Sequence, residues 1–303
     1  MPNSNNYSAI LTTYNAEDTF QRAFKSIINQ STKPDEIIIV DDASTDKTFA
    51  IINRIAGDNE RIKIIKSTTN LGPANSRNLG VSVSKNDCLV FFDDDDESEE
   101  IRAEIQIENL NQSDLNYVSS QKIYSREYTK DFINNEFKGK IDSKELLEFL
   151  LIGSKNSNFI FSIPASTMAI RRTAFNDIGG FDNDFRRLED VDLAIRAADA
   201  GLIFSFTSNK LVKRYHSVAV DKNPLYESVS QMILIRKYEN RLNPRKYKEI
   251  KAWYFVRSYY FNKKYLKLFF KLTYFILRYG LRKEILLTGI NRFKHDQKIK
   301  SAS

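Results

Sequence analysis

Residues 1–110 alternate between short apolar runs and longer segments of helical length. The clearest apolar run is IIIV at residues 37–40, which no polar residue interrupts. Such a run is typical of a strand that is buried on both faces of a sheet. Strands that alternate with helices of about 10–15 residues form βαβ units. The sequence therefore predicts an α/β fold with a mostly parallel sheet flanked by helices. The predicted strands are 7–13, 36–41, 61–66 and 88–92, and the predicted helices are 17–29, 46–56 and 73–84.

Polar residues gather where these predicted strands end. In open α/β sheets, ligands bind beyond the carboxyl ends of the strands. The residues at these ends are Thr13, Tyr14, Asn15, Asp41, Asp42, Asn70, Leu71, Gly72 and Asp93 to Asp96. We expect a ligand-binding site at this edge of the sheet.

The apolar segment LVFF leads directly into four aspartates, Asp93 to Asp96. One or two acids would suffice to cap the helix predicted at residues 99–110. Four neighbouring carboxylates repel one another, which favours a bound cation. Ligands that are all oxygen suit a hard metal such as Mg²⁺ or Mn²⁺. Capping and metal binding both remain open, and metal binding is the favoured interpretation.

Three further features allow a structural and a functional interpretation. Asp42 follows a buried strand. Ser44 or Asp46 can cap the helix that comes next, but capping does not account for Asp42, whose carboxylate can accept hydrogen bonds from a base or a ribose. Glu189 and Asp190 begin a predicted helix, either as an acidic first turn or with one carboxylate as a general base. His216 is one of two histidines in the chain and is either structural or a ligand.

Six segments in order resemble the family 2 glycosyltransferases, which have the nucleotide-sugar-binding GT-A fold. They are LTTYN at 11–15, IIIVDDASTDKT at 37–48, NLGPANSRNLG at 70–80, LVFFDDDDE at 89–97, IGGFDNDF at 178–185 and LEDVDLAIR at 188–196. The resemblance extends over roughly residues 7–216. It implies transfer of a sugar from a nucleoside diphosphate donor, commonly a UDP-sugar, with inversion at the anomeric carbon.

The resemblance also implies a role for each matching residue. The residues implied at the nucleotide are Thr13, Tyr14, Asn15, Asp42, Asn70 and Arg77, with Asp42 at the base. Asp95 would be the direct ligand of Mn²⁺ or Mg²⁺, with Asp93 or Asp94 near the ribose or the water shell of the metal. The run of aspartates leaves this register open by one position. Asp190 would be the catalytic base with Glu189 close to the acceptor, and His216 would be a further metal or diphosphate contact.

Charge is divided unevenly along the chain. Residues 241–303 contain 17 basic and 3 acidic side chains, whereas residues 1–240 contain 29 and 36. Five basic residues fall within about 60° on a helical projection, beside a broad apolar face; they are Lys264, Lys267, Lys271, Arg278 and Arg282. The favoured interpretation is a helix on an anionic membrane surface, and the alternative is a helix packed on its own catalytic domain. So large an apolar surface argues against nucleic acid as a partner.

These observations predict a catalytic GT-A domain over residues 1–220, with a nucleotide-binding half at 1–110 and an acceptor half at 111–220. A helical, basic and amphipathic region follows at 221–303. The single cysteine and the start of the sequence, which lacks the features of a signal peptide, favour the cytoplasm. We expect a peripheral enzyme at the inner face of the plasma membrane that transfers sugar to a glycan or lipid-linked acceptor in surface polysaccharide or glycolipid synthesis. The alternatives are a non-catalytic membrane-docking subunit and a nucleotidyltransferase.

Overall fold

The computed structural model describes residues 6–124, 127–130, 136–152, 163–215, 224–261 and 264–280. Its strands are β1 (Tyr7–Thr13), β2 (Glu36–Asp41), β3 (Ile62–Lys66), β4 (Cys88–Asp93), β5 (Asp96–Ser98), β6 (Leu115–Tyr124), β7 (Glu127–Lys130), β8 (Phe137–Lys140), β9 (Met168–Arg171) and β10 (Ile203–Tyr215). Its helices are α1 (Phe20–Ile28), α2 (Thr48–Ala56), α3 (Pro73–Val83), α4 (Arg102–Leu110), α5 (Ser143–Ile152), α6 (Arg172–Asp177), α7 (Glu189–Asp199), α8 (Pro224–Lys237), α9 (Pro244–Phe261) and α10 (Tyr265–Tyr279).

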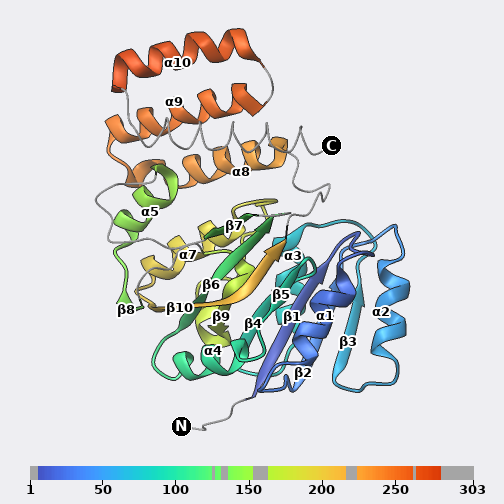
Figure 1. Cartoon of the computed structure of the whole chain (residues 1–303). Helices are drawn as coiled ribbons and strands as arrows, with labels where there is room; N and C mark the ends of the chain where they lie inside the picture. Colours follow the sequence, from blue (N-terminus) through green and yellow to red (C-terminus); the bar gives the residue numbers. More distant parts are fainter. Residues whose placement is uncertain are drawn as a thin grey trace.

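The strands form one sheet in the order β3-β2-β1-β4-β9-β6-β10-β5, with β7 paired to β6 and β8 paired to β10 (Figure 1). One set of strands shares a direction, namely β3, β2, β1, β4, β6 and β10. The remaining strands, β9, β5, β7 and β8, run the opposite way. The predicted α/β fold with a mostly parallel, helix-flanked sheet is confirmed. The antiparallel strands β7, β8 and β9 follow residue 110, whereas β5 precedes it.

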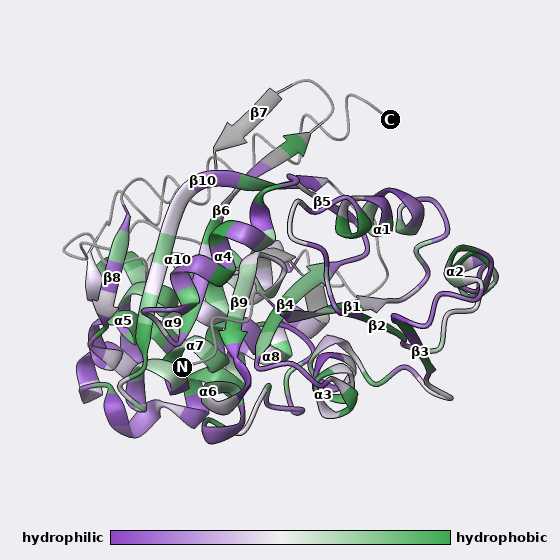
Figure 2. Ribbon diagram, turned by 90° about the horizontal axis from the view of Figure 1, so that it is seen from below, coloured by the Kyte–Doolittle hydropathy of each residue, from purple (hydrophilic) through white to green (hydrophobic). Residues whose placement is uncertain are grey.

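The apolar run at residues 37–40 divides its side chains between two hydrophobic clusters. Ile38 and Val40 join the cluster that α3 and α7 contribute to, whereas Ile37 and Ile39 join the cluster of α1, α2 and α4. Both faces of β2 are therefore covered, which is why the run has no polar alternation. The covering helices are amphipathic, and Figure 2 shows hydrophobic and hydrophilic residues alternating along α1 and α2.

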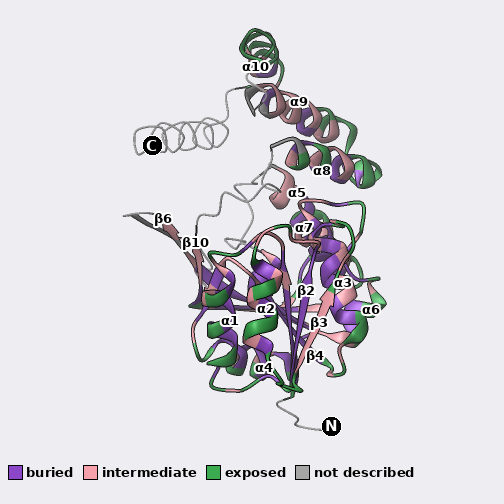
Figure 3. Cartoon of the chain, turned by 90° about the vertical axis from the view of Figure 1, so that its right-hand side faces the viewer, coloured by how far each residue is buried: buried purple, intermediate pink, exposed green. Residues whose placement is uncertain are grey.

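The helices after residue 224 form a stack beside α7. α8 packs near α7, α9 lies on α8, and α10 is the outermost layer (Figures 1 and 3). Among the helices that the structure describes, none is long and apolar enough to cross a membrane. The domain boundary predicted between residues 220 and 221 lies outside the described residues.

A buried carboxylate joins α7 to this stack. Asp192 is 0% exposed and accepts hydrogen bonds from Nε of Arg196 and from the hydroxyl of Tyr238, both at 2.8 Å. The Nζ atom of Lys237, at the end of α8, lies 2.7 Å from the same carboxylate. Because a buried charge is costly without such partners, these contacts fix α8 relative to α7.

We predict that Tyr238→Phe lowers the free energy of unfolding by about 1–3 kcal/mol, because it removes a buried hydrogen bond to a charged group without changing the packing. Urea unfolding followed by circular dichroism measures this. The matched control is Tyr274→Phe on α10, where the side chain is half exposed and a change below about 0.5 kcal/mol is expected. Equal stabilities for wild type and Tyr238→Phe would contradict the role given to this contact.

Candidate active site

The carboxyl ends of three neighbouring strands bring the predicted strand-end residues together. In the register of the sheet, Thr13 of β1 lies beside Asp41 of β2, and Thr12 lies beside Asp93 of β4. Because these strands are parallel, the loops that follow them leave the sheet at the same edge. The structure thus assembles the predicted site from segments that are far apart in the sequence.

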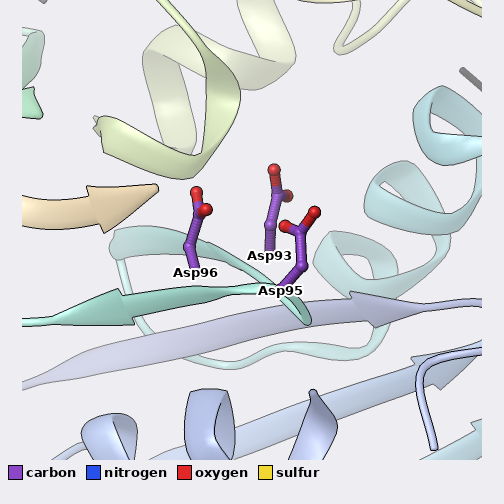
Figure 4. Close-up of side chains that lie close together, drawn as sticks. All are labelled: Asp93, Asp95 and Asp96. Carbon is purple, nitrogen blue, oxygen red and sulfur yellow. The ribbon is translucent and has the colours of Figure 1, made fainter. Parts of the chain in front are cut away.

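The four consecutive aspartates separate into two groups. The chain turns between the end of β4 at Asp93 and the start of β5 at Asp96. Asp93, Asp95 and Asp96 place carboxylate oxygens within 4.8 Å of one another, and Figure 4 shows their side chains pointing into the same space. Asp94 instead faces the end of β1, where its Oδ2 accepts a hydrogen bond from the backbone N–H of Tyr14 at 3.0 Å.

The chemistry of this carboxylate cluster fits a hard divalent cation. Burial, followed by the negative charges of Asp95 and Asp93, raises the pKa of Asp96 to about 8. Repulsion of this kind is relieved when a cation is bound, and a set of oxygen ligands suits Mg²⁺ or Mn²⁺. Asp93 and Asp95 were predicted near a metal, whereas Asp96 belonged to the predicted acidic run without being assigned as a ligand.

Arg77 connects this cluster to the start of α7. Its guanidinium is buried, with Nη2 2.8 Å from Oδ1 of Asp93 and Nη1 2.6 Å from Oε1 of Glu189. Burial acts to lower the pKa of Arg77, but the two carboxylates outweigh it and raise the pKa above its usual value. The predicted contact of Arg77 with a nucleotide remains a prediction. These contacts place the guanidinium of Arg77 between the carboxylate cluster and Glu189.

Asp190 follows Glu189 in the first turn of α7. Burial, and then the charge of Glu189, raises the pKa of Asp190 to about 6, while Arg77 acts in the opposite direction. Near neutral pH the carboxylate is therefore unprotonated and is a stronger base than an ordinary aspartate. A general base needs this property, and the role of Asp190 as the catalytic base remains a prediction.

The predicted nucleotide residues hold the surrounding loops in place. Both carboxylate oxygens of Asp42 accept backbone hydrogen bonds, from Leu71 at 2.8 Å and from Gly72 at 2.7 Å. Asn70 accepts hydrogen bonds from Arg186, a residue that the sequence analysis did not single out. Across the site, the side-chain oxygen of Asn15 accepts a hydrogen bond from the backbone of Thr45 at 2.8 Å. The contacts of these residues with a nucleotide remain predictions.

Backbone strain is concentrated around the site. The non-glycine residues with positive φ, among those the structure describes, are Asn15 at 50°, Ala43 at 65° and Leu188 at 66°. They adjoin Tyr14, Asp42 and Glu189 respectively. Left-handed backbone is unfavourable for residues with a side chain, and it is often found where function requires a particular geometry. Its distribution here supports the location of the site.

A second contact supports the turn that carries the aspartates. Arg22 of α1 donates a hydrogen bond to the backbone oxygen of Asp95 at 2.7 Å, and its guanidinium lies 3.8 Å from the ring centre of Tyr215. The hydroxyl of Tyr215 in turn donates to Glu97 at 2.8 Å. Arg22 and Tyr215 could not be assigned to the site from the sequence, because nothing local links them to the aspartates. His216, predicted as a metal or diphosphate contact, lies outside the described residues.

Known proteins resemble this chain in sequence and in fold. The model of Glycosyl transferase family 2 matches residues 8–179. An uncharacterized glycosyltransferase of Haemophilus influenzae is 30% identical over 178 residues, which are 59% of this chain and 69% of that protein. The Escherichia coli UDP-Glc:alpha-D-GlcNAc-diphosphoundecaprenol beta-1,3-glucosyltransferase WfaP is 40% identical over 89 residues, which are 29% of this chain and 35% of that protein.

A solved structure extends the likeness to the fold. S. aureus TarS 1-349 in complex with UDP-GlcNAc matches with a TM-score of 0.60 at 19% identity, over 92% of this chain and 82% of that one. The chain therefore belongs to glycosyl transferase family 2 and is a glycosyltransferase with the GT-A fold.

We predict that activity falls as the pH is lowered through about 6, because only the unprotonated carboxylate of Asp190 can accept a proton. Glu189→Gln should move this acid limb to lower pH, since it removes the negative charge that raises the pKa of Asp190 and leaves the lowering effect of Arg77. The measurement is the pH profile of sugar transfer, with Glu60→Gln, an exposed acid on the α2–β3 loop, as control. An acid limb that stays in place or moves to higher pH in Glu189→Gln would count against Asp190 as the titrating group.

Proposed function

We propose that this glycosyltransferase moves a sugar from a UDP-linked donor to a lipid-linked glycan in surface polysaccharide or glycolipid synthesis, with inversion at the anomeric carbon. The observation that carries the proposal is the pair of ion pairs of Arg77, which sets Asp93 of the carboxylate cluster beside Glu189 and so near the base candidate Asp190. The names of the relatives support the substrate class. WfaP is described as using UDP-Glc and a diphosphoundecaprenol acceptor, and TarS binds UDP-GlcNAc.

In the proposed reaction, Asp190 accepts the proton of an acceptor hydroxyl. The hydroxyl oxygen forms a bond to the anomeric carbon while the bond from that carbon to the diphosphate oxygen breaks. The electron pair of the broken bond leaves with the nucleoside diphosphate, and attack from the opposite side inverts the anomeric centre. Glu189 lies beside the base, where its charge helps to keep the pKa of Asp190 raised.

The donor would lie along the strand ends. Asp93, Asp95 and Asp96 would hold Mg²⁺ or Mn²⁺, which when bound supplies positive charge for the leaving diphosphate. The side chains proposed to surround the nucleotide are Thr13, Tyr14, Asn15, Asp42, Asn70 and Arg77, with Asp94 supporting Tyr14 from behind. His216 stays a candidate for a further contact with the metal or the diphosphate.

The proposed location is the cytoplasmic face of the plasma membrane, where the enzyme would bind peripherally through residues 241–303. The strong positive charge of this region supports the location, since the cytoplasmic leaflet carries anionic lipids. A lipid-linked acceptor would be available at the same surface.

Asp190→Asn should lower the rate of sugar transfer by about 10²- to 10⁴-fold, because the amide cannot accept the proton. The assay measures UDP release from a panel of UDP-sugars with a lipid-linked acceptor, and calorimetry checks that the variant still binds the donor. The control is Asp184→Asn, which changes an exposed acid on the preceding loop. A rate within tenfold of wild type would place the base elsewhere.

Asp96→Asn should weaken Mn²⁺ binding by tenfold or more, since it removes one carboxylate of the cluster. Asp94→Asn should have a smaller effect, because Asp94 faces the backbone of Tyr14. Electron paramagnetic resonance of free Mn²⁺ measures both affinities without requiring activity. If Asp94→Asn abolished binding and Asp96→Asn preserved it, the assignment of ligands within the aspartate run would be wrong.

A further inference from the structure

The outermost helix, α10, exposes an unusual amount of apolar surface. Its large apolar side chains that face solvent are between 53% and 83% exposed; they are Tyr265, Leu266, Phe269, Phe270, Tyr274 and Leu277. Figure 3 shows most of this helix in the colour of exposed residues. By contrast, Phe275 is buried against α9, with its ring centre 5.5 Å from that of Trp253. One side of α10 therefore packs on the protein, and the other presents hydrophobic residues to the surroundings.

The exposed apolar side chains lie on the side of α10 that faces away from α9. At about 100° per residue, Leu266, Phe270 and Leu277 fall within about 40° of one another and lie about 160° from Phe275. Since Phe275 faces α9, the exposed group points away from it. α10 is the layer farthest from the sheet in both side views (Figures 1 and 3). The apolar face is thus directed outward, away from the catalytic domain, which contradicts the alternative that α10 buries this face on its own catalytic domain.

A cationic stripe runs along one side of the apolar face. Lys267, Lys271 and Arg278 fall within about 40° of one another, about 100° from the centre of the apolar group. Lys264 immediately precedes α10, and Arg282 of the predicted stripe lies outside the described residues. Residues 251–280 contain no aspartate or glutamate. An anionic surface can therefore approach α10 without meeting a like charge from this segment.

We propose that the outward face of α10 is a docking surface for a bilayer that contains anionic lipids. The apolar side chains enter the boundary between headgroups and acyl chains, while the lysines and the arginine contact lipid phosphates. Charge complementarity selects this occupant over a protein partner, because lysine is depleted in protein–protein interfaces and abundant on membrane-surface helices. The inference deepens the proposed function by naming the surface that brings the enzyme to a lipid-linked acceptor.

The docking surface is connected through packed helices to α7, the helix that carries Asp190. α10 packs on α9 and α9 on α8, and the end of α8 is held to α7 by the contacts of Asp192 with Lys237 and Tyr238. α7 begins at Glu189 and carries Asp190. A bilayer bound to α10 therefore fixes the orientation of the base relative to the membrane. Docking should raise the rate on an acceptor embedded in the bilayer and leave the rate on a soluble acceptor unchanged.

Flotation of the full-length protein with vesicles tests the proposal. The vesicles are phosphatidylcholine alone or a mixture with phosphatidylglycerol, at low and at high NaCl. Wild type should float with the anionic vesicles at low salt and dissociate at high salt. The triple variant Lys267→Gln, Lys271→Gln, Arg278→Gln should bind more than 100-fold more weakly, at about fivefold for each cationic contact. The triple variant Leu266→Ser, Phe270→Ser, Leu277→Ser should bind the anionic vesicles at least tenfold more weakly.

The matched control replaces apolar residues that are also exposed but lie on the catalytic domain, as Ile28→Ser, Val83→Ser, Ile101→Ser. This variant should float like wild type, and thermal melts should show that all three variants are folded. Wild type that stays unbound to anionic vesicles at low salt would overturn the proposal. Undiminished vesicle binding by both α10 variants would also overturn it. A third contrary result would be a wild-type protein that binds no lipid and forms a dimer, with the apolar variant monomeric.

The same preparations separate this inference from the proposed function. UDP release with a soluble acceptor reports the chemistry and does not require docking. Vesicle binding by an inactive protein would leave the α10 surface standing and remove the proposed reaction. Activity with the soluble acceptor but no vesicle binding would do the reverse.

Discussion

The arrangement of the site depends on one buried guanidinium. Arg77 of α3 pairs with Asp93 at the end of β4 and with Glu189 at the start of α7, at 2.8 and 2.6 Å. A buried charge must be paired, and so must the acids around it, because an unpaired partner is strongly destabilising. This requirement connects the first half of the sheet to the helix that carries Asp190. The positive charge of Arg77 offsets the repulsion between the carboxylate cluster and the acids at the start of α7, and this allows them to lie close together.

Much of the first half of the fold could be predicted from the sequence. The bounds of β1 and β2 agree with the predicted 7–13 and 36–41, since a strand buried on both faces shows an uninterrupted apolar run at its centre. The strands after residue 110 were harder to predict from the sequence. β10 runs from Ile203 to Tyr215, and the sequence does not show its full length, because its later residues are partly exposed and its pairing with β6 shifts register near Lys210. A partly exposed strand contains polar residues, so its sequence lacks the apolar run from which a buried strand is predicted.

The same distinction holds for the site. Strand-end acids such as Asp42 and Asp93 could be predicted, because the carboxyl edge of a parallel sheet is where ligands bind. A run of four aspartates has no periodicity, so only the turn between β4 and β5 decides that Asp96 joins the cluster and Asp94 faces away. Arg22 and Arg186 could not be predicted, since each acts on a residue more than 70 positions away. The basic stripe of α10 was predicted, but that its apolar face points outward depends on the packing of Phe275.

We infer that the carboxylate cluster and the strand-end loops form one donor site next to Asp190. Anomalous diffraction from a crystal grown with Mn²⁺ and UDP tests it most directly. We expect a manganese peak among the carboxylates of Asp93, Asp95 and Asp96, with the diphosphate on the side of Asp190 and the uracil near Asp42. A manganese peak away from these aspartates, or UDP bound outside the edge formed by β1, β2 and β4, would contradict it.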